Sequence, residues 1–155
     1  MARQRPRADI AASIDWRRLF TSLEGRIGRQ LFWIGVLLLL FVGIPIQLFV
    51  VALAGDLAGF IVSLAFLYPG YAVNVKRAHD RNRPAWIIGL FYALLIAIVF
   101  MQLADLHMTD GQPNGPFVLA GATFLLFAIV LTIDLGILRG TPGKNQYGPD
   151  PLKQR

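Results

Sequence analysis

The chain has 155 residues, of which 55% are hydrophobic and only 15% are charged. Soluble domains of this size carry about a quarter charged residues, so the composition excludes an ordinary water-soluble globule. The net charge of +6 could also indicate nucleic-acid binding. However, the basic residues gather at the ends of apolar runs, where membrane topology accounts for them, and no nucleic acid is expected as a partner.

Four apolar runs, each about as long as a bilayer-spanning helix, follow one another along the chain. They cover residues 31–53, 57–75, 85–104 and 117–138. A bilayer core of about 30 Å needs about 20 apolar residues in a helix, and backbone groups in lipid must bond within their own segment. The sequence therefore predicts an all-α integral membrane domain of four transmembrane helices over residues 31–138.

Lysine and arginine fall on alternate sides of these predicted helices. Residues 1–30 contain seven, residues 76–84 contain four and residues 139–155 contain four, whereas the two remaining connections contain none. The positive-inside rule assigns the basic connections to the cytoplasm. We therefore expect a basic cytoplasmic N-terminal segment over residues 1–30 and a cytoplasmic C-terminal tail over residues 139–155.

The predicted N-terminal segment ends in a stretch, residues 14–31, that mixes arginines with large apolar residues. This pattern is typical of a short amphipathic helix that lies in the headgroup layer, and two glycines within it are expected to break it. Indole rings favour the membrane boundary. The expected interface anchors are therefore Trp16, Trp33 and Trp86.

Three short motifs stand at the predicted cytoplasmic ends of the helices. They read Gly25-Arg26-x-x-Arg29-x-x-Phe32-Trp33, then Arg77-x-His79-Asp80 followed by Trp86, and finally Asn145-x-Tyr147-Gly148-x-Asp150-Pro151. In these motifs the chain resembles the small bacterial proteins classified as domain of unknown function 805. The resemblance implies a four-span protein of the bacterial inner (plasma) membrane, and it brings no established activity with it.

The polar side chains of these motifs form the candidate binding site. Guanidinium groups match phosphate and carboxylate geometry, and the cytoplasmic membrane surface carries anionic lipids. The first hypothesis is therefore a non-enzymatic protein whose basic face binds anionic membrane lipid or a protein partner, which includes a second copy of itself. The predicted site consists of Arg26, Arg29, Arg77, His79, Asp80, Asn145 and Tyr147.

Asp134 is the only charged residue within a predicted span. Charges at membrane depth often mark transport pathways, so the second hypothesis is a small transporter or channel subunit, in which prolines kink the first two spans. Asp134 lies near the cytoplasmic end of its span, and a structural ion pair is the preferred interpretation. Its expected partners are Arg139, Arg77 or Lys76.

The third hypothesis is an enzyme that acts on lipid phosphates through the adjacent His79 and Asp80. A salt-bridged turn is the preferred interpretation of this pair, because no second catalytic cluster accompanies it. His79 is expected inside and His107 outside, and the chain contains no cysteine. Zinc sites need three or four ligands, so no metal, cofactor or catalytic residue is expected.

Overall fold

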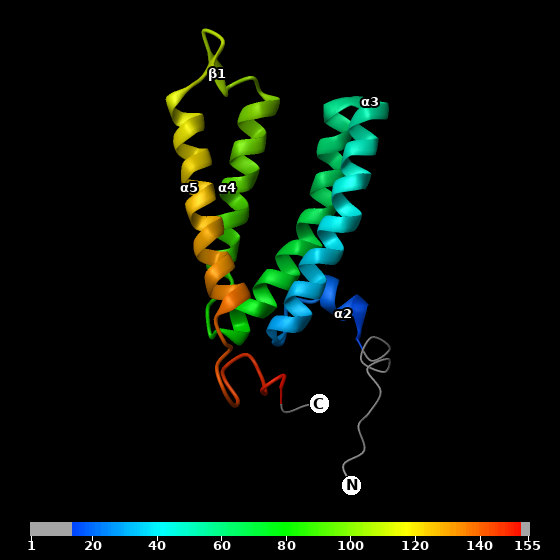
Figure 1. Ribbon diagram of the computed structural model, residues 1–155, viewed down its shortest axis with the longest axis vertical. Helices are drawn as coiled ribbons and strands as arrows, with labels where there is room; N and C mark the ends of the chain where they lie inside the picture. The colour runs from blue at the N-terminus through cyan, green and yellow to red at the C-terminus, as the bar shows by residue number, and fades with distance from the viewer. Residues whose placement is uncertain (1–13, 153–155) are drawn as a thin grey trace.

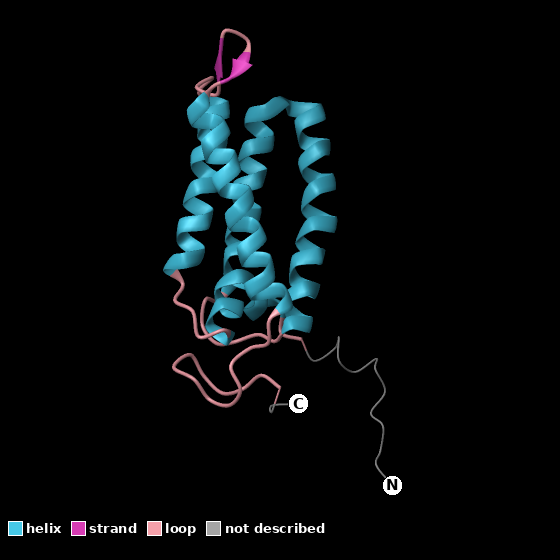
Figure 2. Ribbon diagram, turned by 60° about the vertical axis from the view of Figure 1, so that its left-hand side comes forward, coloured by secondary structure: helices cyan, strands magenta, loops and turns pink. Residues whose placement is uncertain are grey.

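The computed structural model describes residues 14–152 and is mostly helical, as Figures 1 and 2 show. Residues 1–13 of the predicted N-terminal segment and residues 153–155 of the predicted tail lie outside the described part. The elements are α2 (Trp16–Thr21), α3 (Arg29–Asp80), α4 (Trp86–Leu103), β1 (Met108–Thr109), β2 (Gln112–Pro113), α5 (Gly115–Leu131) and the π-helix η1 (Thr132–Ile137). The two short strands form an antiparallel hairpin between α4 and α5.

Among residues 14–152, three helices are long and apolar enough to cross a membrane: α3, α4 and the continuous stretch from α5 through η1. Only 6% of the most apolar 18-residue window of each is buried inside the protein. These exposed apolar surfaces can contact lipid, because the backbone N–H and C=O groups of a helix are already hydrogen-bonded within the helix. The structure is thus mostly helical, as predicted, and the surfaces of its apolar helices are those expected of a membrane protein.

The longest helix, α3, folds back on itself at Gly55 (Figure 1). The backbone there has φ 79° and ψ 179°, a conformation open chiefly to glycine. The two arms pack side by side, so that residues at nearly equal distances from Gly55 meet. Gly43 thus faces Phe66, and Gly35 faces Val73. These arms coincide with the first two predicted apolar runs.

The second arm of α3 continues past the apolar run to Asp80. The sequence instead predicts a loop over residues 76–84, because charged residues end the run there. The helix persists because Lys76, Arg77 and Asp80 are buried, and each finds polar partners in neighbouring segments. A change in hydropathy therefore marks the end of the apolar run without marking the end of the helix.

The N-terminal amphipathic helix is shorter than the predicted stretch of residues 14–31. It begins at an Asp15 cap, whose Oδ1 accepts from the Arg18 amide at 2.9 Å, and ends where Ser22 adopts extended backbone. Its last carbonyls bond outside the helix. Lys76 Nζ donates to Arg18 O at 2.6 Å, and Tyr68 Oη donates to Thr21 O at 2.7 Å. These contacts fasten α2 to the second arm of α3.

The buried core lies at one end of the helices, called here the polar end, where α2, residues 76–85 and residues 139–152 gather (Figure 2). Towards the opposite end, called here the loop end, the α3 hairpin and the α4–α5 pair diverge (Figure 1). The helices are therefore joined chiefly at the polar end. The core residues are Leu19, Ile27, Phe32, Val73, Val75, Ala78, Ile88, Leu131 and Leu135.

We predict that Gly59→Ala destabilises the α3 hairpin. A Cβ on Gly59 would overlap the Val51 side chain and lie 3.1 Å from Gln47 Nε2. Such overpacking costs about 1–3 kcal/mol and should lower the thermal midpoint of the protein in detergent, followed by circular dichroism. Gly121→Ala is the matched control, because nothing lies within 4 Å of its Cβ position. Equal midpoints for the two variants would contradict this packing of the arms.

Candidate functional site

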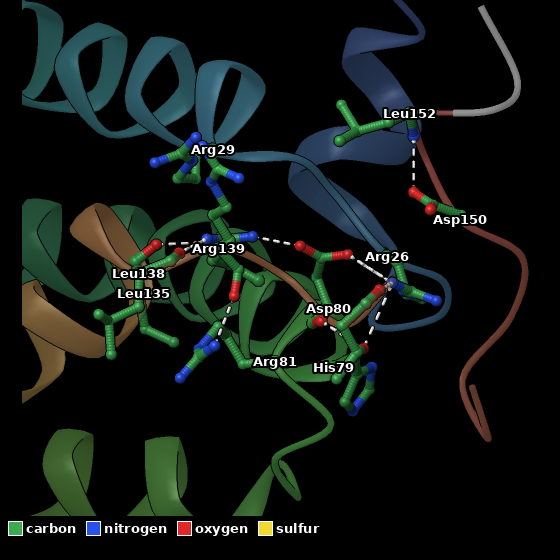
Figure 3. Close-up of polar contacts among 12 residues, drawn as sticks. Arg26, Arg29, His79, Asp80, Arg81, Leu135, Leu138, Arg139, Asp150 and Leu152 are labelled. Carbon is green, nitrogen blue, oxygen red and sulfur yellow. Dashed lines mark hydrogen bonds and ion pairs between the residues drawn. The ribbon is translucent and has the colours of Figure 1, made fainter. Parts of the chain in front are cut away.

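Asp80, the last residue of α3, holds two arginines from different parts of the chain (Figure 3). Its Oδ1 accepts from Nε and Nη2 of Arg26 at 3.1 and 2.9 Å, and its Oδ2 accepts from Nη1 of Arg77. The side chains of both arginines are 1% exposed, and that of Asp80 is 3% exposed. The Asp80 carboxylate therefore supplies the counter-charge for both buried guanidinium groups, and they supply its hydrogen-bond donors.

The remaining donors of Arg26 hold the C-terminal segment. Nη1 donates to Gly143 O at 2.7 Å and to Gly148 O at 3.2 Å, and Nη2 donates to Thr141 O at 2.6 Å. This segment consists of turn-forming residues without a hydrophobic period, so local sequence alone does not position it. The Arg26 guanidinium supplies the missing constraint.

Thr141 adds a second link to the end of α3. Its amide and its Oγ1 both donate to the backbone carbonyl of Asp80, each at 2.8 Å. Gly140, one residue earlier, lies so close that a Cβ there would overlap the Asp80 carboxylate. Sequence reasoning missed both residues. Their only signal was the Gly-Thr-Pro-Gly turn composition, which does not say what the turn contacts.

Side-chain donors also cap the end of η1, where successive carbonyls lack helical partners. Arg77 bridges two of them, because Nε donates to Leu135 O and Nη2 donates to Leu138 O, both at 2.6 Å. The carbonyls between and after these accept from Trp33 Nε1, Arg29 Nη1 and Arg81 Nη1. Cationic donors at this position also oppose the negative end of the helix dipole.

Trp33 packs on the same turn. A Cβ on Gly136 would lie 2.6 Å from Trp33 Cζ2, so the indole ring requires glycine at this position of η1. Its Nε1 donates to Gly136 O at 3.1 Å. Trp33 is 38% exposed, as is Trp16, and Trp86 is 67% exposed. All three predicted interface anchors thus stand at or near the start of a helix at the polar end.

His79 does not pair with the neighbouring carboxylate of Asp80. Its ring stacks on Tyr147, with centroids 3.8 Å apart and planes 6° apart. Asn145 Nδ2 donates to His79 O at 2.9 Å. These residues clamp the C-terminal segment onto the end of α3.

Asp134 lies in η1 and is paired. Its Oδ1 accepts from Nη2 and Nε of Arg81 at 2.9 and 3.3 Å, and Arg83 Nε lies 3.8 Å from its Oδ2. The interpretation of Asp134 as a paired residue therefore fits the structure. The partners differ from those expected, which were Arg139, Arg77 and Lys76, because Arg77 is engaged by Asp80 and Lys76 by α2.

Two open cavities flank the Arg26–Asp80 pair. The larger has a volume of about 690 Å³ and is lined by charged residues from α3 and the C-terminal segment, with Trp33 beside them. The smaller, of about 550 Å³, lies between α2, the start of α3 and the prolines of that segment. Within residues 14–152, no group of three or more histidine or acidic side chains is arranged to hold a metal.

These features define a small helical protein with apolar helices of membrane-spanning length and a buried arginine–aspartate cluster that ties three sequence motifs together. The family model described as "Protein of unknown function (DUF805)" matches residues 20–149, and the chain belongs to this family. The resemblance seen in the motifs is thereby confirmed.

Two relatives from Escherichia coli are similar to the chain over most of its length. Both are named "Uncharacterized protein YiiR", one from strain K12 and one from O157:H7, and each is 38% identical over 137 residues. The matched region covers 83% of this chain and 85% of each relative. No solved structure matches the chain.

We predict that Asp80→Asn destabilises the protein by about 3–5 kcal/mol, because two buried guanidinium groups lose their counter-charge. The thermal midpoint in detergent should fall, and trypsin should cut after Lys144 faster as the C-terminal segment loosens. Arg83→Gln is the control, since its side chain is 55% exposed and 3.8 Å from Asp134. Such surface pairs contribute about 0–1 kcal/mol. If Asp80→Asn behaves like this control, the cluster does not hold the segment.

Proposed function

We propose that the protein is a non-enzymatic, four-span protein of a bacterial inner membrane, with both termini in the cytoplasm and a polar end that binds anionic phospholipid. The four spans are the two arms of α3, then α4, then α5 with η1. Each arm exceeds the length of about 20 helical residues that a bilayer core requires. Gly55 and the β1–β2 hairpin then form the two outer turns.

The distribution of charge supports this orientation. The basic residues of the described part belong to α2, to the start and end of α3 and to the connections at the polar end. The loop end carries Asp56, Asp105 and Asp110 instead. Because basic residues near span ends are retained in the cytoplasm, the polar end is assigned to that side.

The observation that carries the lipid-binding proposal is the division of the arginines into two groups. Arg26 and Arg77 are buried, and their nitrogens are bonded within the protein, which gives them a structural role. A second group is exposed at the polar end and borders apolar helix surface, where lipid phosphates lie. This group consists of Arg17, Arg18, Arg29, Arg83 and Arg139.

Contacts within the protein favour this proposal over the two alternatives, an enzyme that acts on lipid phosphates and a transporter or channel subunit. Both carboxylate oxygens of Asp80 accept from arginines, so Asp80 is not free to assist His79 as a base. Asp134 is neutralised by Arg81. Within α3, Gly55 is the only residue with non-helical dihedrals, and the two prolines expected to open a transport path therefore stand in helical backbone.

We predict that single cysteines report this topology, because the chain has none of its own. Gln112→Cys lies in β2 at the loop end, and Lys144→Cys lies in the C-terminal segment; both positions are exposed. In intact spheroplasts a membrane-impermeant maleimide should label the first variant and not the second. After lysis both should react. The reverse pattern, or equal labelling before lysis, would refute the proposed orientation.

We predict that delipidated protein in mild detergent retains phosphatidylglycerol in preference to phosphatidylethanolamine when native mass spectrometry is run with equal amounts of both. A basic residue near an anionic surface contributes about 1 kcal/mol, so several exposed arginines imply a preference of at least about tenfold. The preference should shrink as salt is raised. Equal retention of the two lipids would contradict the proposal and turn attention to a protein partner.

A further inference from the structure

We propose that the larger cavity is a phospholipid site, in which Arg29 and Arg139 bind the phosphodiester of one anionic lipid while its acyl chains lie along the first arm of α3 and η1. This inference rests on the proposed function, because it assigns anionic-lipid binding to one place on the polar end. Neither arginine is part of the buried cluster around Asp80.

Arg29 and Arg139 line one cavity, although they stand at opposite ends of the helical part of the sequence. Arg29 is the first residue of α3, Arg139 follows η1, and both line the space of about 690 Å³. Both are exposed, and Figure 3 shows their side chains extending into the same region. Two guanidinium groups that line one cavity attract an anion that both can bind.

Donors remain available on both side chains. Arg29 uses Nη1 for Ile137 O at 3.0 Å, which leaves Nε and Nη2 without an acceptor among residues 14–152. The Arg139 guanidinium donates to no residue in that described range; its contact with Arg81 is made through its own carbonyl oxygen. Arg26 and Arg77, in contrast, have acceptors at all three nitrogens.

The charge of the cavity fits a phosphodiester. Its lining contains the cations Arg29, Arg77 and Arg139 and the anions Asp80 and Asp150. The Asp80 carboxylate is bound by buried arginines, and that of Asp150 accepts from backbone amides at 3.0 Å. One positive charge is left over, and the single negative charge of a phosphodiester balances it.

Apolar surface continues from the cavity towards the loop end, which indicates a lipid instead of a free phosphate. Arg29, Trp33 and Leu37 stand four residues apart on one face of the first arm, and Leu37 is 44% exposed. Across the Trp33–Gly136 contact, η1 presents Ile133 and Ile137, which are 45% and 59% exposed. A headgroup between the arginines would thus have acyl-compatible surface beside it.

The test compares two double variants with the same change of charge. Arg29→Gln with Arg139→Gln removes the cavity pair, and Arg17→Gln with Arg83→Gln removes two exposed arginines that do not line the cavity. Native mass spectrometry measures phosphatidylglycerol binding to each delipidated protein, with inorganic phosphate as competitor. Both variants lose the same charge and therefore the same general attraction to an anionic lipid. Loss of charged hydrogen bonds should weaken binding at least about tenfold further in the cavity variant than in the other.

A third variant and the competitor separate the remaining outcomes. The Arg139 side chain makes no hydrogen bond within residues 14–152, so Arg139→Gln alone removes none of the contacts that hold the fold. We expect this single variant to bind phosphatidylglycerol at least about threefold more weakly. Equal losses in the two double variants would overturn this site and leave the proposed function standing. Wild-type protein without a preference for phosphatidylglycerol would overturn both. Displacement of the lipid by millimolar phosphate would identify a free anion as the ligand and overturn the lipid assignment.

Discussion

A carboxylate buried at the end of a helix needs cationic donors, and the way in which Asp80 obtains them organises the polar end. Arg26 arrives from the segment before α3, and Arg77 stands one turn earlier in α3 itself. The donors that these arginines have left then reach the carbonyls of the C-terminal segment and of η1. One acidic residue thus fixes four stretches of chain, because breaking a buried charge pair costs several kcal/mol.

The cost of burying charge also explains why the arginines divide into two groups. Hydrogen bonds from every guanidinium nitrogen of Arg26 and Arg77 offset the free-energy cost of burying their charge. The same bonds make these two side chains unavailable to a ligand. Arg29 and Arg139 stay at the surface, with donors to spare next to apolar helix. The arginines proposed to bind lipid are therefore those whose donors are not used within the fold.

Packing is concentrated where the charges are. The core lies at the polar end, and the hairpin of α3 separates from the α4–α5 pair towards the loop end, where large apolar side chains such as Phe49 and Leu53 are exposed. A soluble protein could not keep such surface in water, whereas lipid tails solvate it at little cost. The polar end is therefore the packed base from which helices with lipid-compatible surfaces diverge.

Features that depend on local composition could be predicted from the residues alone: the helical class, the four apolar runs, the gathering of basic residues and the family motifs. Four other features depend on tertiary packing: the helix continues through Lys76 to Asp80, α2 ends at Thr21, Asp134 pairs with Arg81, and Gly140 lies against Asp80. Hydropathy depends only on the order of residues along the chain. The partner of a guanidinium group, however, depends on which oxygens lie within about 3 Å once distant segments have packed together.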